Sequence, residues 1–204
     1  MMTFQILTAL ALVTCGSIEI SHKNEFNTLR PTQFPPCVRT IEISETDEEV
    51  YNEKCINESQ KMQSISEDDA CSCFQYVLQK TIGLEDEVNF PGRLLSIVFE
   101  DYFEQTDKPC ANDIVVYTYD ENETIMMYHF GIVIDNNTIE SLWGSEIRRH
   151  QLFNVPTYFG NAAWFYTLKK EYKGPEGKKK AIASIKKCLN LQKKILKVTS
   201  FFAR

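Results

Sequence analysis

Apolar and polar residues repeat along the middle of this 204-residue chain in two different periods. Between residues 71 and 83 the apolar positions recur every three or four residues and stop at a glycine, which predicts an amphipathic helix. The spacing repeats over residues 93 to 105, directly after Pro91-Gly92. We therefore expect two successive helices, the first with acidic residues just ahead of its N-terminus, where the helix dipole favours negative charge.

After residue 112 the pattern changes to β-branched runs and strict alternation. Residues 113 to 117, 128 to 134, 138 to 141 and 163 to 168 predict four strands. Asp135-Asn136-Asn137 lies between the second and third strands and predicts a tight hairpin turn. Helices followed by an antiparallel meander predict an α+β fold.

The two ends of the chain differ from this middle part. Residues 1 to 17 hold an apolar stretch that ends in small residues, which is typical of a secretory signal peptide, with a buried helix as the alternative. A weak bacterial lipobox ends at Cys15, so a lipid anchor there is a lesser possibility. Residues 18 to 60 mix prolines with an acidic run and predict an irregular arm. Residues 61 to 170 then form the domain, and residues 171 to 204 a basic amphipathic tail.

The formal net charge of −6 is unevenly divided along the chain. From Lys169 onward twelve Lys or Arg stand against two Glu, a balance of +10, which leaves −16 for residues 1 to 168. An acidic domain argues against a nucleic-acid partner, because phosphate binding needs clustered cations. The tail could pack its apolar side on the domain, or contact an anionic membrane, a wall polymer or a protein partner.

Seven cysteines are present, and six remain if the leader is removed. An even number in an exported protein favours disulfides. Cys37 with Cys55 is the simplest pair, and either Cys71 or Cys73 could bond to Cys110, although the sequence does not fix the pairing. The rest of the chain has no second closely spaced Cys or His pair, so neither a zinc site nor another cofactor is expected.

Chemistry is best supported where a cysteine opens the first helix and a histidine opens a strand. A thiol at a helix N-terminus is favoured as thiolate, and free backbone N–H groups there can hold an oxyanion. His129 shares one strand face with Gly131, and the missing side chain leaves a space that could admit a ligand or the end of a neighbouring helix. A Cys and a His that meet there would be a nucleophile and its base.

Three segments follow one another in a set order: CFQYV at residues 73 to 77, NDIV at residues 112 to 115, and HFGI at residues 129 to 132. In this order they resemble the circularly permuted papain-like fold of the NlpC and CHAP families of cysteine peptidases and amidases, over about residues 62 to 168. The resemblance implies Cys73 as the nucleophile, with Cys71 as the alternative, and His129 as the base.

The resemblance also implies a third, polar residue on the strand after the turn, which orients the imidazole. Glu140 or Ser141 could occupy that position, and Glu140 is preferred because a carboxylate stabilises an imidazolium ion. Those families carry Asp or Asn just before the nucleophile, where this chain has Ser72. His150 follows two arginines, and we expect it to be a surface residue in a polar loop.

The function that the resemblance implies is an exported cysteine hydrolase, secreted or held in the cell envelope. It would cleave amide or peptide bonds, with bacterial cell-wall peptide as a candidate substrate. One alternative is a non-catalytic papain-like binding module whose cysteines are tied in disulfides. Another is an acyltransferase of the same superfamily, so the partner would be a peptide, peptidoglycan or an acyl substrate.

Overall fold

The computed structural model of the chain describes residues 28–29, 37–39, 44–64, 72–85, 92–121 and 124–202. The chain divides into two compact units, Phe26–Ala183 and a second unit made of Met1–Glu25 and Ser184–Arg204. The first unit holds every strand of the described residues, and the candidate site residues. The predicted signal peptide with Cys15, and the alternative nucleophile Cys71, lie outside the described residues.

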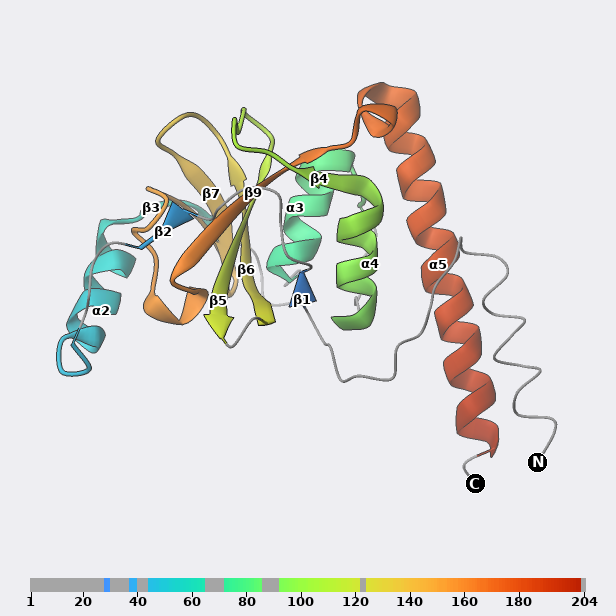
Figure 1. Cartoon of the computed structure of the whole chain (residues 1–204), viewed down its shortest axis with the longest axis horizontal. Helices are drawn as coiled ribbons and strands as arrows, with labels where there is room; N and C mark the ends of the chain where they lie inside the picture. Colours follow the sequence, from blue (N-terminus) through green and yellow to red (C-terminus); the bar gives the residue numbers. More distant parts are fainter. Residues whose placement is uncertain are drawn as a thin grey trace. The chain divides into compact units, whose positions relative to one another are not determined.

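The described strands form one antiparallel sheet with the order β2-β9-β5-β6-β7-β8-β3, in which β1 also pairs with β6 and β4 with β9 (Figure 1). The strands are β1 (Thr28–Leu29), β2 (Cys37–Val38), β3 (Gln60–Ser64), β4 (Phe103–Gln105), β5 (Ile114–Glu121), β6 (Thr124–Val133), β7 (Ile139–Trp143), β8 (Glu146–His150) and β9 (Ala162–Leu168). Together with the helices, this sheet confirms the prediction of an α+β fold with antiparallel strands.

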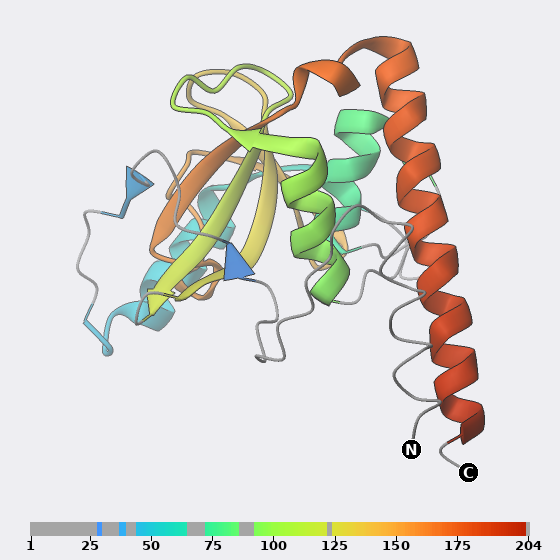
Figure 2. The ribbon, with the colours of Figure 1, turned by 45° about the vertical axis from the view of Figure 1, so that its right-hand side comes forward.

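The helices of the first unit lie on both sides of these strands. Figures 1 and 2 show α3 (Cys73–Ile82) and α4 (Gly92–Tyr102) on one side and α2 (Glu48–Glu58) on the other. Both helices that the apolar spacing predicted are therefore present. α3 ends as expected at Gly83, whose φ of 80° is a left-handed conformation that glycine adopts without steric cost.

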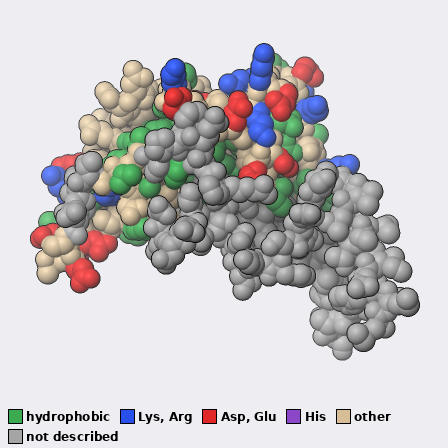
Figure 3. Space-filling model, viewed as in Figure 1, with side chains coloured by type: hydrophobic (Ala, Val, Ile, Leu, Met, Phe, Trp, Pro, Cys, Tyr) green, Lys and Arg blue, Asp and Glu red, His purple; other side chains and the backbone are tan. Residues whose placement is uncertain are grey.

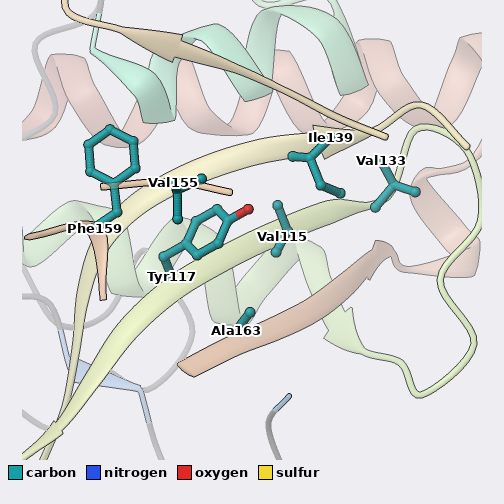
Figure 4. Packing of buried hydrophobic residues seen from close by; sticks show 7 residues of the cluster. All are labelled: Val115, Tyr117, Val133, Ile139, Val155, Phe159 and Ala163. Carbon is teal, nitrogen blue, oxygen red and sulfur yellow. The ribbon is translucent and has the colours of Figure 1, made fainter. Parts of the chain in front are cut away.

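Two layers of buried side chains cover the two faces of the sheet. On the side of α3 and α4, Phe130 of β6 packs against Phe74 and Phe99, with ring centroids 5.0 and 5.7 Å apart. On the opposite side lies a second apolar cluster, in which Tyr117 takes a central place (Figure 4). Its buried members are Val115, Tyr117, Val133, Ile139, Val155, Phe159 and Ala163. Successive residues of β6 thus point into different layers, as alternation requires.

The arm predicted to be irregular is partly regular. Residues 48–58 form α2, and β1 and β2 join the sheet. The helix escaped prediction because Cys55 is its one buried residue, so no apolar period marks it in the sequence. β8 was likewise missed, since Arg148 and Arg149 gave it the composition of a polar loop. Their charges are met by the carboxylates of Glu146, at 2.6 Å, and Glu140, at 3.1 Å.

One predicted end also differs. Residues 103–105 leave the predicted second helix and pair with β9 as β4. The tail helix α5 (Gly174–Phe202) begins within the predicted basic tail, and Pro175 fits the first turn of a helix. Along it Ala181, Ile185 and Leu189 are buried at a spacing of four residues. None of the helices in the described part of the chain has the length and apolar character of a membrane span.

Candidate active site

Cys73 is the first residue of α3, and its side chain is partly exposed. The preceding residue, Ser72, is extended and its Oγ accepts a hydrogen bond of 3.2 Å from the backbone N–H of Gln75. Ser72 is therefore the N-cap. Ser, Asp and Asn all serve well at that position.

α3 is held on the sheet by one aromatic contact and one buried polar network. Phe74 packs against Phe130, and the Tyr76 hydroxyl donates a 2.5 Å hydrogen bond to Oε1 of Glu140. Oε2 of Glu140 accepts a hydrogen bond of 3.1 Å from Nε of Arg149, and Lys80 Nζ lies 3.6 Å from Oε1.

Glu140 is ionised in this setting although its side chain is buried. Burial alone would raise the pKa of the carboxyl, but the hydrogen bonds from Tyr76 and Arg149 together with the positive charges of Lys80 and Arg149 outweigh it, and the net pKa is lowered. The carboxylate thus serves as an anchor for α3. It faces the helix rather than His129, because Glu140 pairs with Ile132, a residue of the opposite face from His129. The pairing register of β6 and β7 therefore does not bring Glu140 into the expected contact with the imidazole.

His129 lies in β6 on the face turned away from α3. Its ring stacks on Phe159, with centroids 3.7 Å apart and planes 14° from parallel, and lies 6.0 Å from the ring of Tyr117. The side chain is only 4% exposed, and no described histidine is visible on the face drawn in Figure 3. Nε2 is buried and has no hydrogen-bond partner among the described residues.

The imidazole of His129 is neutral over the ordinary pH range. Burial, with a smaller contribution from nearby His150, lowers its pKa to about 3. A neutral imidazole has one nitrogen free to accept a proton. A pKa this far below neutrality nevertheless makes it a weak base, because the best pKa for a general base lies near the operating pH. Its protonated form, in contrast, is poorly tolerated in this environment.

An irregularity in β6 lies next to His129. The pairing with β5 runs from Tyr117 with His129 to Thr118 with Met127, so Tyr128 is an extra residue on the β6 side. The described pairing of β6 with β7 ends at Gly131 and Ser141, although β7 continues to Trp143. On the edge of β6 that faces β7, the backbone of His129 is therefore not paired with β7.

Gly131 does not leave the open space that the sequence suggested. A Cβ placed there would lie 2.7 Å from Cγ2 of Ile139, 3.1 Å from Cγ1 of Val115 and 3.2 Å from Cβ of Ser141. The neighbouring strands fill the room, and a glycine is required because they approach so closely.

Ser141 lies on the same face as His129 and Gly131, in a network with two aromatic residues. Its Oγ is 2.7 Å from Nε2 of His150 and accepts a 2.7 Å hydrogen bond from Nε1 of Trp143. His150 is 5% exposed, so the prediction of a surface histidine was wrong. The buried residues of β8 are Ile147 and His150, which are three positions apart, so no simple alternation marked His150 in the sequence.

Arg39 of the N-terminal arm binds residues 155–160, the segment whose Phe159 covers the ring of His129. The Arg39 guanidinium donates hydrogen bonds of 3.2 Å to the carbonyl of Val155 and of 3.1 Å to that of Gly160. It also donates to the Tyr51 hydroxyl at 2.9 Å. Gly160 ends η2 (Thr157–Phe159) with a φ of 131°, and a Cβ there would meet the Thr118 backbone at 2.5 Å. Only glycine fits at position 160, because any side chain would collide with the backbone of Thr118.

α2 contributes further bonds to the same segment. Asn52 and Thr157 exchange two hydrogen bonds, of 3.2 and 2.8 Å, and Glu48 accepts a third from the Thr157 hydroxyl. Two residues later, Phe159 stacks on His129. The arm and the imidazole are thus connected through one short helical turn.

The remaining expectations concern cysteines and metals. Cys37 and Cys110 are exposed free thiols and Cys55 is a buried one, so the Cys37–Cys55 disulfide is not formed in this structure. Within the described residues no group of three or more His, Cys, Asp or Glu is arranged to hold a metal ion. A cavity of about 400 Å³ is lined by Ile139 and five other residues, none of them a predicted site residue: Asn137, Gln151, Leu152, Phe153 and Phe165.

The helix that begins with Cys73 thus packs directly on the strand that holds His129. Glu140 lies on the face of the sheet that α3 covers, and Ser141 lies on the opposite face, with His129. The chain matches no protein-family model, and no curated protein or solved structure is significantly similar to it.

Proposed function

We propose that this protein is a cysteine hydrolase of amide or peptide bonds, with Cys73 as nucleophile and His129 as base. The observation that carries the proposal is the packing of Phe74 on Phe130, with ring centroids 5.0 Å apart. Phe74 directly follows Cys73 in the sequence, and Phe130 directly follows His129. The backbones of Cys73 and His129 are therefore each one residue from the same contact, although 56 positions separate them in the sequence.

In this proposal the thiol meets the imidazole beside β6, not through the sheet. The His129 ring is on the far face from α3, so a direct approach across the strand is closed. α3 contacts both β6 and β7, and the ladder between these two strands stops at Gly131 and Ser141. That divergence supports an approach of the helix N-terminus to the ring, and the bulge at Tyr128 is the kind of irregularity that often re-aims a side chain next to an active site.

The chemistry follows from a neutral base and a helix terminus. His129 would take the thiol proton as Sγ of Cys73 attacks the carbonyl carbon of the substrate. The carbonyl oxygen would gain negative charge beside the unpaired N–H groups of the first turn of α3. Breakage of the C–N bond would release the amine with the proton from His129, and water, deprotonated by the same imidazole, would hydrolyse the thioester.

Alkylation of the unreduced protein tests the dyad, with Cys110 as an internal control because it is an exposed free thiol outside any helix. Iodoacetamide should label Cys73 faster than Cys110 below about pH 7. His129→Ala should slow the labelling of Cys73 alone. Equal rates at the two cysteines, or no effect of His129→Ala, would contradict the proposal. Mass spectrometry with Cys71→Ser and Cys73→Ser variants assigns the labelled thiol.

A second candidate, a non-catalytic module built on the same strands and helices, is supported by the burial of His129 beneath Phe159. Its disulfide-tied form is not supported by Cys37, Cys55 and Cys110, which are free thiols. This candidate predicts that Cys73 reacts like an ordinary thiol, with half-ionisation near about pH 8.5, in both the native protein and His129→Ala.

Substrate and location extend the proposal by resemblance. A bacterial wall peptide is the substrate implied by the NlpC and CHAP families, and an acyl group would be transferred if the chain is an acyltransferase. Export follows from the leader-like residues 1 to 17, and the basic tail would bring the protein to an anionic membrane or wall polymer. A mature exported protein that still carries residues 1 to 17 would contradict cleavage of a signal peptide.

A further inference from the structure

We propose that Arg39 and α2 form a strap: they hold residues 153–160 over His129, and the imidazole becomes accessible when the strap is released. The structure is then the closed, self-inhibited state of the protein. This inference rests on the proposed function for its meaning, because it assigns a means of regulating the base of that site. It also gives a role to the N-terminal arm, for which the sequence predicted no structure.

Arg39 binds the covering segment on both sides of Phe159, the residue whose ring lies over the imidazole. Its guanidinium donates to the carbonyl of Val155 at 3.2 Å and to that of Gly160 at 3.1 Å. Its backbone N–H donates to the carbonyl of Asn161 at 2.8 Å. Because these acceptors flank Phe159 in the sequence, the position of the covering ring depends on Arg39.

α2 binds the same segment at further points. The Tyr51 hydroxyl donates a hydrogen bond of 2.8 Å to the carbonyl of Phe153. Asn52 donates to the Thr157 hydroxyl at 3.2 Å and accepts from the Thr157 backbone N–H at 2.8 Å, and Glu48 accepts from the Thr157 hydroxyl. All of these are hydrogen bonds between partly buried or exposed groups, which water replaces at small net cost when they open.

The strap can open without unfolding the sheet, because little apolar surface holds it in place. Cys55 is the one buried residue of α2, whereas Val50 on the same helix is 67% exposed. Elements with few buried apolar contacts are the ones that open at the lowest free energy. Nε of Arg39 is also buried without a hydrogen-bond partner among the described residues, so the guanidinium is not fully satisfied in the closed state.

The C-terminal end of α2 is fixed to the sheet instead of the covering segment. Nη1 of Arg148, in β8, donates hydrogen bonds of 2.6 Å to the carbonyl of Ile56 and to Oγ of Ser59. β3 begins at the next residue and pairs with β8. The N-terminal half of α2 can therefore swing away about residues 56–59 while β3 stays in the sheet.

Release of the strap would loosen the covering segment without detaching it. β5 still binds that segment, since the Tyr117 hydroxyl donates to the carbonyl of Leu152 at 2.8 Å and the Tyr119 hydroxyl donates to that of Thr157. The imidazole of His129 would become accessible and would lose part of the burial that is the main cause of its low pKa. An open state would thus present a stronger base than the closed one.

Acylation of the full-length protein with diethyl pyrocarbonate tests the strap, with each modified histidine located by mass spectrometry. Arg39→Met removes the guanidinium and should raise the acylation rate of His129 at least about tenfold, since several hydrogen bonds to the segment are lost. Asn52→Ala should raise it about threefold. Lys54→Ala is the matched control on α2, because Lys54 pairs with Glu58 of the same helix, and should leave the rate unchanged.

His150 separates release of the strap from unfolding. Its Nε2 lies 2.7 Å from Oγ of Ser141 and its Nδ1 lies 2.9 Å from the carbonyl oxygen of Gln151, and neither partner belongs to the strap. His150 should therefore stay protected in every variant. A folded Arg39→Met protein in which His129 is acylated no faster would overturn the inference. Equal gains at His129 and His150 in Asn52→Ala would also overturn it, because the arm would then support the whole fold.

These rates do not depend on Cys73, so Cys73→Ser should leave them unchanged and the strap can be confirmed even if the proposed dyad fails. If His129→Ala does slow the alkylation of Cys73 in the native protein, Arg39→Met should speed the labelling of Cys73 by iodoacetamide below about pH 7. Labelling that is no faster, in a variant whose His129 is more accessible, would contradict an inhibitory role for the strap.

Discussion

The Tyr76 hydroxyl donates a buried 2.5 Å hydrogen bond to Oε1 of Glu140, and this bond joins α3 to the centre of the sheet. Tyr76 is three residues after Cys73 and so lies on nearly the same side of the helix. The position of the candidate nucleophile therefore depends on a carboxylate that the sequence suggested for a different role.

Removal of this hydroxyl should destabilise the fold. Tyr76→Phe leaves one oxygen of a buried carboxylate short of its strongest partner, so the free energy of unfolding should fall by about 1–3 kcal/mol in urea titration. Lys80→Met is the control, because Lys80 is half-exposed and its ion pair with Glu140 should contribute less than about 1 kcal/mol. Equal losses in the two variants would contradict an anchoring role for Tyr76.

Phe159 should control the protonation of His129. Burial is the largest cause of the lowered pKa of His129, and the Phe159 ring covers the imidazole. Phe159→Leu keeps an apolar side chain but removes the stacked ring, so the pKa of His129 should rise from about 3 toward the ordinary value, measured by NMR titration. Tyr158→Leu is the matched control, since Tyr158 is 57% exposed. A pKa that stays low without the ring would assign the burial to other residues.

Stability should decline in mild acid because of two buried histidines. The pKa values of His129 and His150 are lowered to about 3 and about 4, whereas a histidine of the unfolded chain titrates near about 6.5. Above pH 6.5 neither state takes up the proton and the histidines add no pH dependence. As the pH falls from about 6.5 to 4, the unfolded chain binds protons that the folded chain refuses, so stability falls by about 1.4 kcal/mol per pH unit for each histidine.

Urea titrations at a series of pH values measure that slope. His150→Gln should remove one of the two contributions and make the decline shallower between pH 6 and 5. In that range the carboxylate of Glu140 remains ionised in both states, because its pKa is lowered by folding and lies below about 4.5 when unfolded. A slope unchanged by His150→Gln would show that His150 is protonated in the folded protein.

The contact at Gly131 should make an added methyl group costly. Gly131→Ala places Cβ 2.7 Å from Cγ2 of Ile139, so overpacking should lower stability by about 1–3 kcal/mol. Ile139→Ala removes that atom. In a double-mutant cycle, Gly131→Ala should therefore cost less in the Ile139→Ala protein than in the native one. If the losses in stability from the two substitutions simply add, the methyl group of Gly131→Ala does not clash with Ile139.

Local signals in the sequence were enough for the elements that carry them. The apolar period and Gly83 defined α3 almost to the residue, and β-branched runs and alternation located β5, β6 and β7, although β5 ends later and β6 begins earlier than predicted. The choice between Glu140 and Ser141 was beyond such signals, because it depends on the register of β7 against β6. A shift of one residue exchanges the two faces of a strand, and no residue in the turn states which register is used.

His150 shows a different limit. Its burial depends on β8 pairing with both β7 and β3, and the residues of β3 precede their partners in β8 by 82 to 89 positions. Two adjacent arginines suggested solvent, yet their partners Glu140 and Glu146 are contributed by neighbouring strand residues. Long-range pairing of this kind leaves no local pattern, so both the buried histidine and its hydrogen bond to Ser141 were out of reach of the sequence.

The strand order has a consequence for how the protein folds. β9, the last strand to be synthesised, lies between β2 and β5, and its partners precede it by about 45 to 125 residues. Until residue 168 has left the ribosome, β5 has an unsatisfied edge. Contacts this distant in sequence are expected to form slowly. A chain halted before β9 would expose the strand run Val115-Val116-Tyr117 and should be prone to aggregation or to capture by chaperones.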